Sequence, residues 1–131
     1  MRVTVDRMKL VLASLLLVPA IAGADVMVSD NDQTVTVDCA KDKNVHVSGN
    51  KATVTLTGVC DKVLLDGNEI SLTGSAVTVG IRGNDNTATL EAVDGILTPG
   101  NKNKVTWKKG VKKAKPKISN AGNGNKIAKV K

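Results

Sequence analysis

The sequence predicts an all-β fold, a short parallel β-solenoid of about six rungs, and three observations support this class. The chain has 131 residues with one Trp, no Phe and no Tyr, so its core cannot be built around aromatic side chains. From position 25 onward it is rich in Val and Thr and contains many Asn, a mixture typical of short strands joined by tight corners. A Gly-Asn dipeptide also recurs at a nearly constant spacing that is too short for repeats containing a helix.

Residues 1–24 predict a secretory signal rather than part of the fold. A basic start precedes an apolar run at 10–18 and a small-residue sequence that ends at Ala24. This run is far shorter than the roughly 20 residues that span a bilayer as a helix, so a membrane-spanning anchor is not expected. We therefore expect cleavage after Ala24, a single solenoid domain over residues 25–131, and a periplasmic or secreted location.

The two cysteines, Cys39 and Cys60, are expected to form one disulfide, because exported chains fold in an oxidising compartment. They stand too far apart in the sequence for a redox-active Cys-x-x-Cys motif. The single histidine, His46, is expected to face solvent and offers no set of metal ligands. The sequence therefore predicts no cofactor and no metal.

The repeat places corners along the chain and strands on both sides of them. A Gly-Asn or Asp-Asn pair marks each corner: Asp30-Asn31, Gly49-Asn50, Gly67-Asn68, Gly83-Asn84, Gly100-Asn101 and Gly122-Asn123. Four places before each corner stands a β-branched residue: Val26, Val45, Val63, Val79, Ile96 and Ile118. Five places after it stands a second apolar column: Val35, Val54, Leu72, Ala88, Val105 and Ile127. The alternation around these columns predicts two half-buried strands per rung, with Gly and Asn in the left-handed backbone conformation at the corner.

Stacking the rungs about 4.8 Å apart merges the inward columns into one core, which also includes Trp107. Cys39 and Cys60 fall at nearly equivalent corners of the first two rungs, so their disulfide is expected to join those rungs. An antiparallel β-sandwich is the alternative, since Gly-Asn also forms hairpin turns. Hairpins do not require equal spacing or aligned columns, so the solenoid is preferred.

The run from Cys39 to Cys60, the Gly-Asn units and the segment 116–125 together resemble a bacterial exported repeat family called domain of unknown function 3060. Its members look like short proteins built from Gly-x-x-Asn-x-Val repeats with a paired-cysteine opening unit. The second Asn of that pattern is present in the last three repeats: Asn86, Asn103 and Asn125. Earlier copies carry Ala52 or Ile70 there, so a continuous Asn ladder is not expected at that end. The resemblance implies a fold and an exported location, and it implies no activity.

Outward positions beside the second apolar column predict a flat threonine face. Its main column contains one Thr per rung in the first five rungs: Thr36, Thr55, Thr73, Thr89 and Thr106. A companion column two places earlier holds further hydroxyl residues: Thr34, Thr53, Ser71 and Thr87. Such arrays resemble the ice-binding faces of small solenoids, although Thr is also favoured on any solvated strand surface. Both interpretations stay open at this point.

Charge is distributed unevenly along the expected rod. Residues 25–94 carry five basic and eleven acidic side chains, whereas residues 95–131 carry eleven basic and no acidic ones. Six lysines lie within the longest stretch between corners: Lys108, Lys109, Lys112, Lys113, Lys115 and Lys117. They are candidates for binding an anionic envelope polymer or lipid headgroups. Lysines that only protect the edge of the last rung are the competing interpretation.

Other partners and activities have less support in the sequence. Nucleic acid is not an expected partner, because Trp107 is the only aromatic side chain available for base stacking. Head-to-tail association is an option, because the acidic first rungs could meet the basic end of a second copy. A glycan-cleaving enzyme is not expected, since carboxylate pairs such as Asp66 with Glu69 lack surrounding Arg or aromatic residues to hold a sugar. The sequence predicts a non-catalytic binding or structural module.

Overall fold

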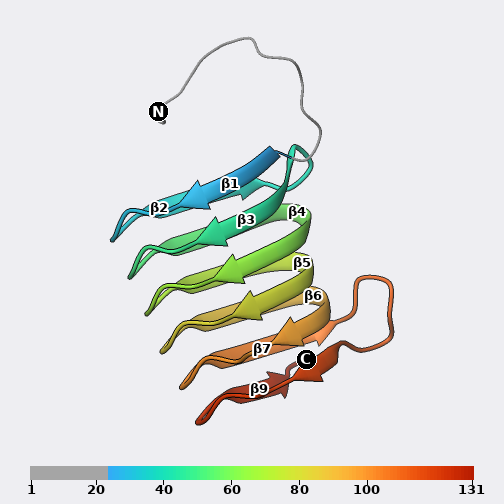
Figure 1. Ribbon diagram of the computed structural model, residues 1–131. Helices are drawn as coiled ribbons and strands as arrows, with labels where there is room; N and C mark the ends of the chain where they lie inside the picture. Colours follow the sequence, from blue (N-terminus) through green and yellow to red (C-terminus); the bar gives the residue numbers. More distant parts are fainter. Residues whose placement is uncertain (1–23) are drawn as a thin grey trace.

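The computed structural model describes residues 24–131, and these residues form a stack of β-strands (Figure 1). The strands belong to one nine-stranded sheet that bends into two faces, with the core between them. Residues 1–23 of the expected signal segment, including its apolar run, lie outside the described residues, and Ala24 is the first residue of β1. Within the part that is described, no helix is long and apolar enough to cross a membrane.

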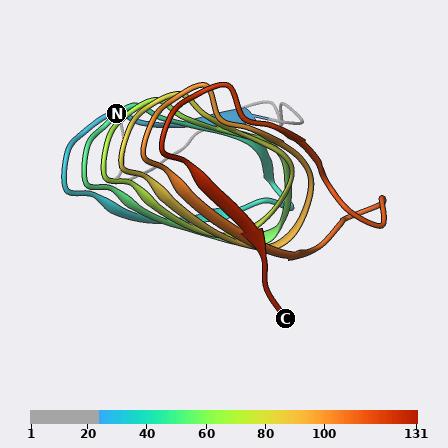
Figure 2. The same cartoon turned by 90° about the horizontal axis from the view of Figure 1, so that it is seen from below.

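All strand pairs in the stack are parallel. The strands are β1 (Ala24–Val28), β2 (Thr34–Asp38), β3 (Asp42–Val47), β4 (Thr53–Leu65), β5 (Ser71–Ile81), β6 (Thr87–Leu97), β7 (Lys104–Lys109), β8 (Lys117–Ser119) and β9 (Lys126–Lys129). One face consists of β1, β3, the later halves of β4, β5 and β6, and β8. The other consists of β2, the earlier halves of β4, β5 and β6, then β7 and β9. Seen along the stack, the rungs superpose as a flattened oval (Figure 2).

The structure is therefore the predicted parallel β-solenoid of about six rungs, and the antiparallel sandwich is wrong. Its register also confirms both apolar columns. The column before the corners runs Val26, Val45, Val63, Val79, Ile96 and Ile118. The column after them runs Val35, Val54, Leu72, Ala88, Val105 and Ile127. Because each rung covers its neighbour, the members of these columns in the middle rungs are fully buried.

The ends of the columns differ from this pattern. Val26, Val35 and Ile127 are only partly buried, and Ile118 is 43% exposed. The prediction that Ile118 belongs to the core is therefore wrong. Its strand β8 pairs with β6 on one side, and no described rung follows to cover the other side. An inward position thus guarantees burial only where rungs lie on both sides.

Glycine has a different role in the corners from the predicted one. The left-handed residue is the third of each corner, with φ between 55° and 71°: Asp32, Lys51, Glu69, Asp85, Lys102 and Gly124. The prediction that the Gly and Asn before it adopt this conformation is wrong. A Cβ on Gly67 would overlap the carbonyl oxygen of Gly49, and a Cβ on Gly83 would overlap that of Gly67. Glycine is required because corner backbones stack too closely for a side chain.

The Asn of each corner pair forms a ladder along the outside of the stack. Its Oδ1 accepts the backbone N–H of the equivalent Asn in the next rung at 2.9–3.0 Å. The ladder is continuous over all six corners: Asn31, Asn50, Asn68, Asn84, Asn101 and Asn123. Asparagine is thus selected at the corners for its side-chain oxygen.

A second, buried Asn ladder is restricted to the later rungs. Asn86 and Asn103 are each 1% exposed. Each Oδ1 accepts a backbone N–H of the preceding rung, and each Nδ2 donates to the glycine carbonyl of the preceding corner at 3.0 Å. Asn125 extends the ladder by one rung. Ala52 and Ile70 fill this position earlier in the chain with buried apolar side chains, as expected from the sequence.

The disulfide between Cys39 and Cys60 forms as predicted, with a Cα–Cα distance of 4.7 Å. Both cysteines are fully buried. Cys39 follows β2 in the first rung and Cys60 lies where β4 bends after the second rung. The bridge therefore joins the first two rungs covalently.

Candidate functional site

The predicted lysines come together around a loop at the later end of the stack. This lysine loop, residues 110–116, leaves the solenoid after β7 and returns at β8, and it projects from the oval outline (Figure 2). The six side chains are contributed by the end of β7, the loop and the start of β8, and all are exposed: Lys108, Lys109, Lys112, Lys113, Lys115 and Lys117. The structure thus presents them to solvent on one continuous stretch of chain.

Asp94 in β6 anchors the start of this loop. Its carboxylate accepts the backbone N–H groups of Val111 at 2.7 Å and of Lys112 and Lys113 at 3.1 Å. Burial acts to raise the pKa of Asp94, but these three donors bind the charged form and hold the pKa below its ordinary value. Converging consecutive N–H groups are a typical anion-binding arrangement, here filled by the protein's own carboxylate. The loop therefore has a defined attachment to the rod.

Most of the positive charge of the lysine cluster is not neutralised nearby. Lys108 Nζ lies 3.4 Å from a carboxylate oxygen of Glu91, and both side chains are about half exposed. Within residues 24–131, the other five lysines of the cluster form no such pair. The cluster therefore keeps a strong positive field around the loop.

The threonine face is aligned in the register predicted for it. Thr36, Thr55, Thr73, Thr89 and Thr106 are successive partners across the strand pairs. The first four are exposed, while Thr106 is half-buried. The companion column is also in register and exposed: Thr34, Thr53, Ser71 and Thr87. The hydroxyl array is therefore regular over the first four rungs.

An ionic cluster at the corners was not expected from the sequence. Arg82 donates to both carboxylate oxygens of Asp66, at 2.5 and 2.7 Å, and the His46 ring lies 2.5 Å from one of them. The Arg82 guanidinium, opposed by partial burial and helped by His46, lowers the pKa of Asp66 to about 2. The expectation that Asp66 lacks a neighbouring Arg is wrong, and His46 faces outward but is partly buried in this contact. Asp66 is thus committed to an ion pair.

The repeat itself contained the signal for this pair. Asp66 and Arg82 each stand immediately before a corner glycine, so the register places them in adjacent rungs. The Asp94 anchor had no such signal, because it depends on a loop that interrupts the repeat. Among residues 24–131, no group of three or more His, Cys, Asp and Glu side chains could hold a metal ion.

Head-to-tail association stays a prediction, and the side chains at the end of the last rung affect how favourable it would be. Lys129 pairs in register with Trp107, a buried core residue, and its Nζ lies 5.9 Å from the centroid of the Trp107 ring. This cation–π contact covers the end of the core with a charged group. A second copy stacked on this end would bury the ammonium, which opposes association.

Comparison with known proteins gives a family but no relative of established activity. Residues 65–124 match the model of the family described as protein of unknown function (DUF3060). Neither a curated protein nor a solved structure matches the chain. The matched segment includes the lysine loop and the first two residues of the buried Asn ladder, and it begins after the disulfide. The resemblance predicted from the sequence is thereby confirmed at the family level over residues 65–124, which match the model of the DUF3060 family.

Proposed function

We propose that this protein is an exported, non-catalytic module that binds an anionic polymer or anionic lipid headgroups through its lysine loop. One observation carries the proposal: six exposed lysines surround a loop that Asp94 attaches to a rigid rod. Residues 95–131 contain all six of these lysines and no acidic side chain, and Glu91 of β6 pairs with Lys108 alone. Binding by presentation of charge requires no catalytic group.

The residue types favour extended anions over a small, oriented ligand. Lysine ammonium groups act as compact point charges on flexible stems, whereas bidentate recognition of one phosphate is better served by arginine. The Asp94 attachment limits the conformations of the loop backbone, which reduces the entropy lost on binding. These features suit a repeating phosphate or sulfate polymer, or the surface of an anionic membrane.

Two matched charge variants test the proposal with long-chain polyphosphate as the probe. In the loop variant, Lys108, Lys109, Lys112 and Lys113 are each replaced by Gln. In the control variant, the four lysines of the earlier rungs are replaced in the same way: Lys41, Lys43, Lys51 and Lys62. Both lose the same formal charge, so net charge alone cannot distinguish them.

We expect the loop variant to bind polyphosphate roughly a thousandfold more weakly, since each of the four lysines contributes on the order of 1 kcal/mol near an anionic surface. The control variant should stay within about threefold of the unmodified protein, since its lysines lie among acidic neighbours. Equal losses in the two variants would show that only total charge matters, and the loop would no longer be the site.

A second candidate function, ice binding, is favoured by the in-register threonine face. Replacing Thr55 and Thr89 with Tyr would interrupt both the flatness and the spacing of the hydroxyl groups. The measurement is thermal hysteresis and inhibition of ice recrystallisation, with Lys62→Tyr on the opposite face as the control. Activity in the unmodified protein that the double variant loses would support this function. Its absence in the unmodified protein would remove the candidate.

A further inference from the structure

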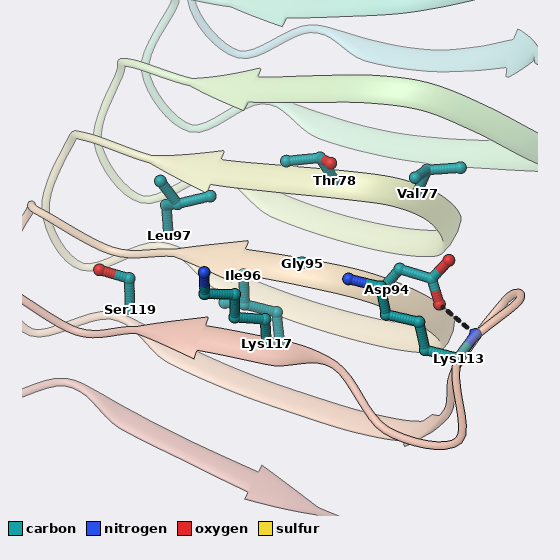
Figure 3. Close-up of a pocket in the computed structure, with 9 residues that line it drawn as sticks. All are labelled: Val77, Thr78, Asp94, Gly95, Ile96, Leu97, Lys113, Lys117 and Ser119. Carbon is teal, nitrogen blue, oxygen red and sulfur yellow. Dashed lines mark hydrogen bonds between the residues drawn. The ribbon is translucent and has the colours of Figure 1, made fainter.

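An open groove lies beside the lysine loop, on the outer surface of the face formed by β5, β6 and β8 (Figure 3). Its volume is about 460 Å³, which lies within the range of small-molecule sites. Strand residues form its floor, and Lys113 of the loop and Lys117 of β8 reach toward β6 from its border. The groove is separate from the threonine face, which lies on the opposite side of the stack.

Gly95, which has no side chain, leaves part of the groove open. Thr78, Gly95 and Lys117 occupy one outward column in three successive rungs, so the middle position of the column is empty. A Cβ on Gly95 would meet Thr78 only at 3.6 Å, an ordinary contact. Unlike the corner glycines, Gly95 is therefore not required by close backbone stacking. The hollow is a feature that a side chain could fill without strain.

The floor of the groove is mainly apolar. Val77 and Leu97 line it with apolar side chains, and Leu97 is 47% exposed. Ile96 also borders the groove, but its side chain is buried in the core. A large apolar side chain exposed beside a hollow gains from contact with an apolar ligand, because the contact removes both surfaces from water. An alkyl chain lying along β6 would make that contact.

The border of the groove is cationic. The ammonium groups of Lys113 and Lys117 belong to a region, residues 95–131, without acidic side chains. Asp94 also lines the groove, but its carboxylate accepts three backbone N–H groups of the loop, which stabilise its negative charge and occupy its oxygen atoms. A ligand is therefore met by an apolar floor and a positive border.

We infer that this groove binds a single-chain lipid with an anionic headgroup. Its headgroup contacts Lys113 and Lys117, and its alkyl chain lies on Val77, Gly95 and Leu97. The inference rests on the proposed function, because lysines of the same cluster bind the headgroup. It adds an apolar part to the ligand, and it gives Gly95 and Leu97 roles in specificity.

The test uses the purified protein and dodecyl phosphate below its micelle concentration, with polyphosphate as the second probe. Affinity should rise from hexyl to dodecyl phosphate by roughly fourfold for each methylene that enters the groove. Gly95→Leu fills the hollow, so it should weaken dodecyl phosphate binding at least tenfold and leave polyphosphate binding unchanged. Ser71→Leu, an exposed strand position on the other face, should change neither.

Leu97→Ser provides a second variant in case Gly95→Leu alters the fold, because Leu97 is a half-exposed surface side chain. Leu97→Ser should reduce the increase in affinity from hexyl to dodecyl phosphate. Alkyl phosphates that bind no better than inorganic phosphate, or variants that bind dodecyl phosphate undiminished, would overturn the inference. Polyphosphate binding by the unmodified protein in that case would leave the proposed function intact. Binding of alkyl phosphates that depends on chain length, without binding of polyphosphate, would support the groove as a lipid site and contradict binding of a polymer by the lysine loop.

Discussion

The first and last rungs of the solenoid share one geometry but are held together by different interactions. The first two are joined by the Cys39–Cys60 bridge, and the inner corner positions that follow are filled by Ala52 and Ile70. The later rungs lie beyond the bridge and are linked by a buried amide ladder centred on Asn103. Charge changes with the same division, from mostly acidic side chains before position 95 to exclusively basic ones after it.

The difference shows which features the rung geometry requires and which it leaves free. Closely stacked corners and outer Asn residues occur in both regions, so they belong to the geometry itself. The inner corner position accepts either an apolar side chain or a fully hydrogen-bonded amide, because each avoids an unsatisfied buried group. Surface charge and loop length are also free, and the candidate site lies where both depart most from the repeat.

Removing the disulfide should have the largest effect on this comparison. The double substitution Cys39→Ala and Cys60→Ala should lower the free energy of unfolding by about 3 kcal/mol, as expected for a closed loop of this length. Urea unfolding measures the total loss in the free energy of unfolding, and hydrogen exchange shows which strands lose stability. Amides of β1 to β3 should lose protection while those of β6 and β7 keep it. Uniform loss along the rod would mean that the two regions are not independently stabilised.

The buried ladder should be the equivalent weak point of the later rungs. Asn103→Ala leaves a buried N–H of Asn86 and a buried glycine carbonyl without partners, so it should cost about 2 kcal/mol. Asn101→Ala, two residues away in the exposed ladder, loses only the bond that the Asn101 side-chain oxygen accepts from Asn123 N–H. It should cost about 0.5 kcal/mol because water replaces that bond. Thermal unfolding measures the loss of stability in each variant, and both variants replace one Asn by Ala. Equal costs would show that burial of the ladder adds nothing.

The ionic cluster before the corners should give a smaller, pH-dependent effect. The folded pKa of Asp66 is about 2, below its ordinary value of 3.8, so its contribution is present above about pH 4 and is lost as the pH falls toward 2. Asp66→Asn should therefore destabilise by about 1 kcal/mol at pH 6, since partial exposure of the pair weakens it. At pH 2 the variant and the unmodified protein should have nearly equal stability. A difference of the same size at both pH values would exclude the ion pair as its cause.

Much of the fold could be predicted because the repeat reports it directly. Columns such as Val45, Val63 and Val79 recur at fixed offsets from the corners, and parallel stacking then determines their register. The sequence does not report backbone angles, so it predicts a left-handed conformation for the corner Gly and Asn. In the structure the third corner residue adopts that conformation. The sequence also could not show that Ile118, equivalent to Ile96 in the repeat, lies at an uncovered end.

The candidate site was predictable only in part. The lysine cluster could be found from the sequence composition alone, because finding it requires no knowledge of contacts. The Asp94 anchor and the groove at Gly95 depend on how a non-repeating loop returns to the sheet, and local sequence patterns do not contain that information. The Asp66–Arg82 pair shows the opposite case, because equivalent places in adjacent rungs were sufficient to find it.

The most direct test of the proposed function is the affinity of the unmodified protein for polyphosphate across a series of salt concentrations. Several lysine–phosphate contacts formed together release counterions together, so the affinity should fall steeply and linearly on logarithmic axes as salt rises. A slope corresponding to several released ions would agree with the exposed lysines around the loop. No binding at low salt, or an affinity independent of salt, would contradict the lysine loop as an anion-binding site.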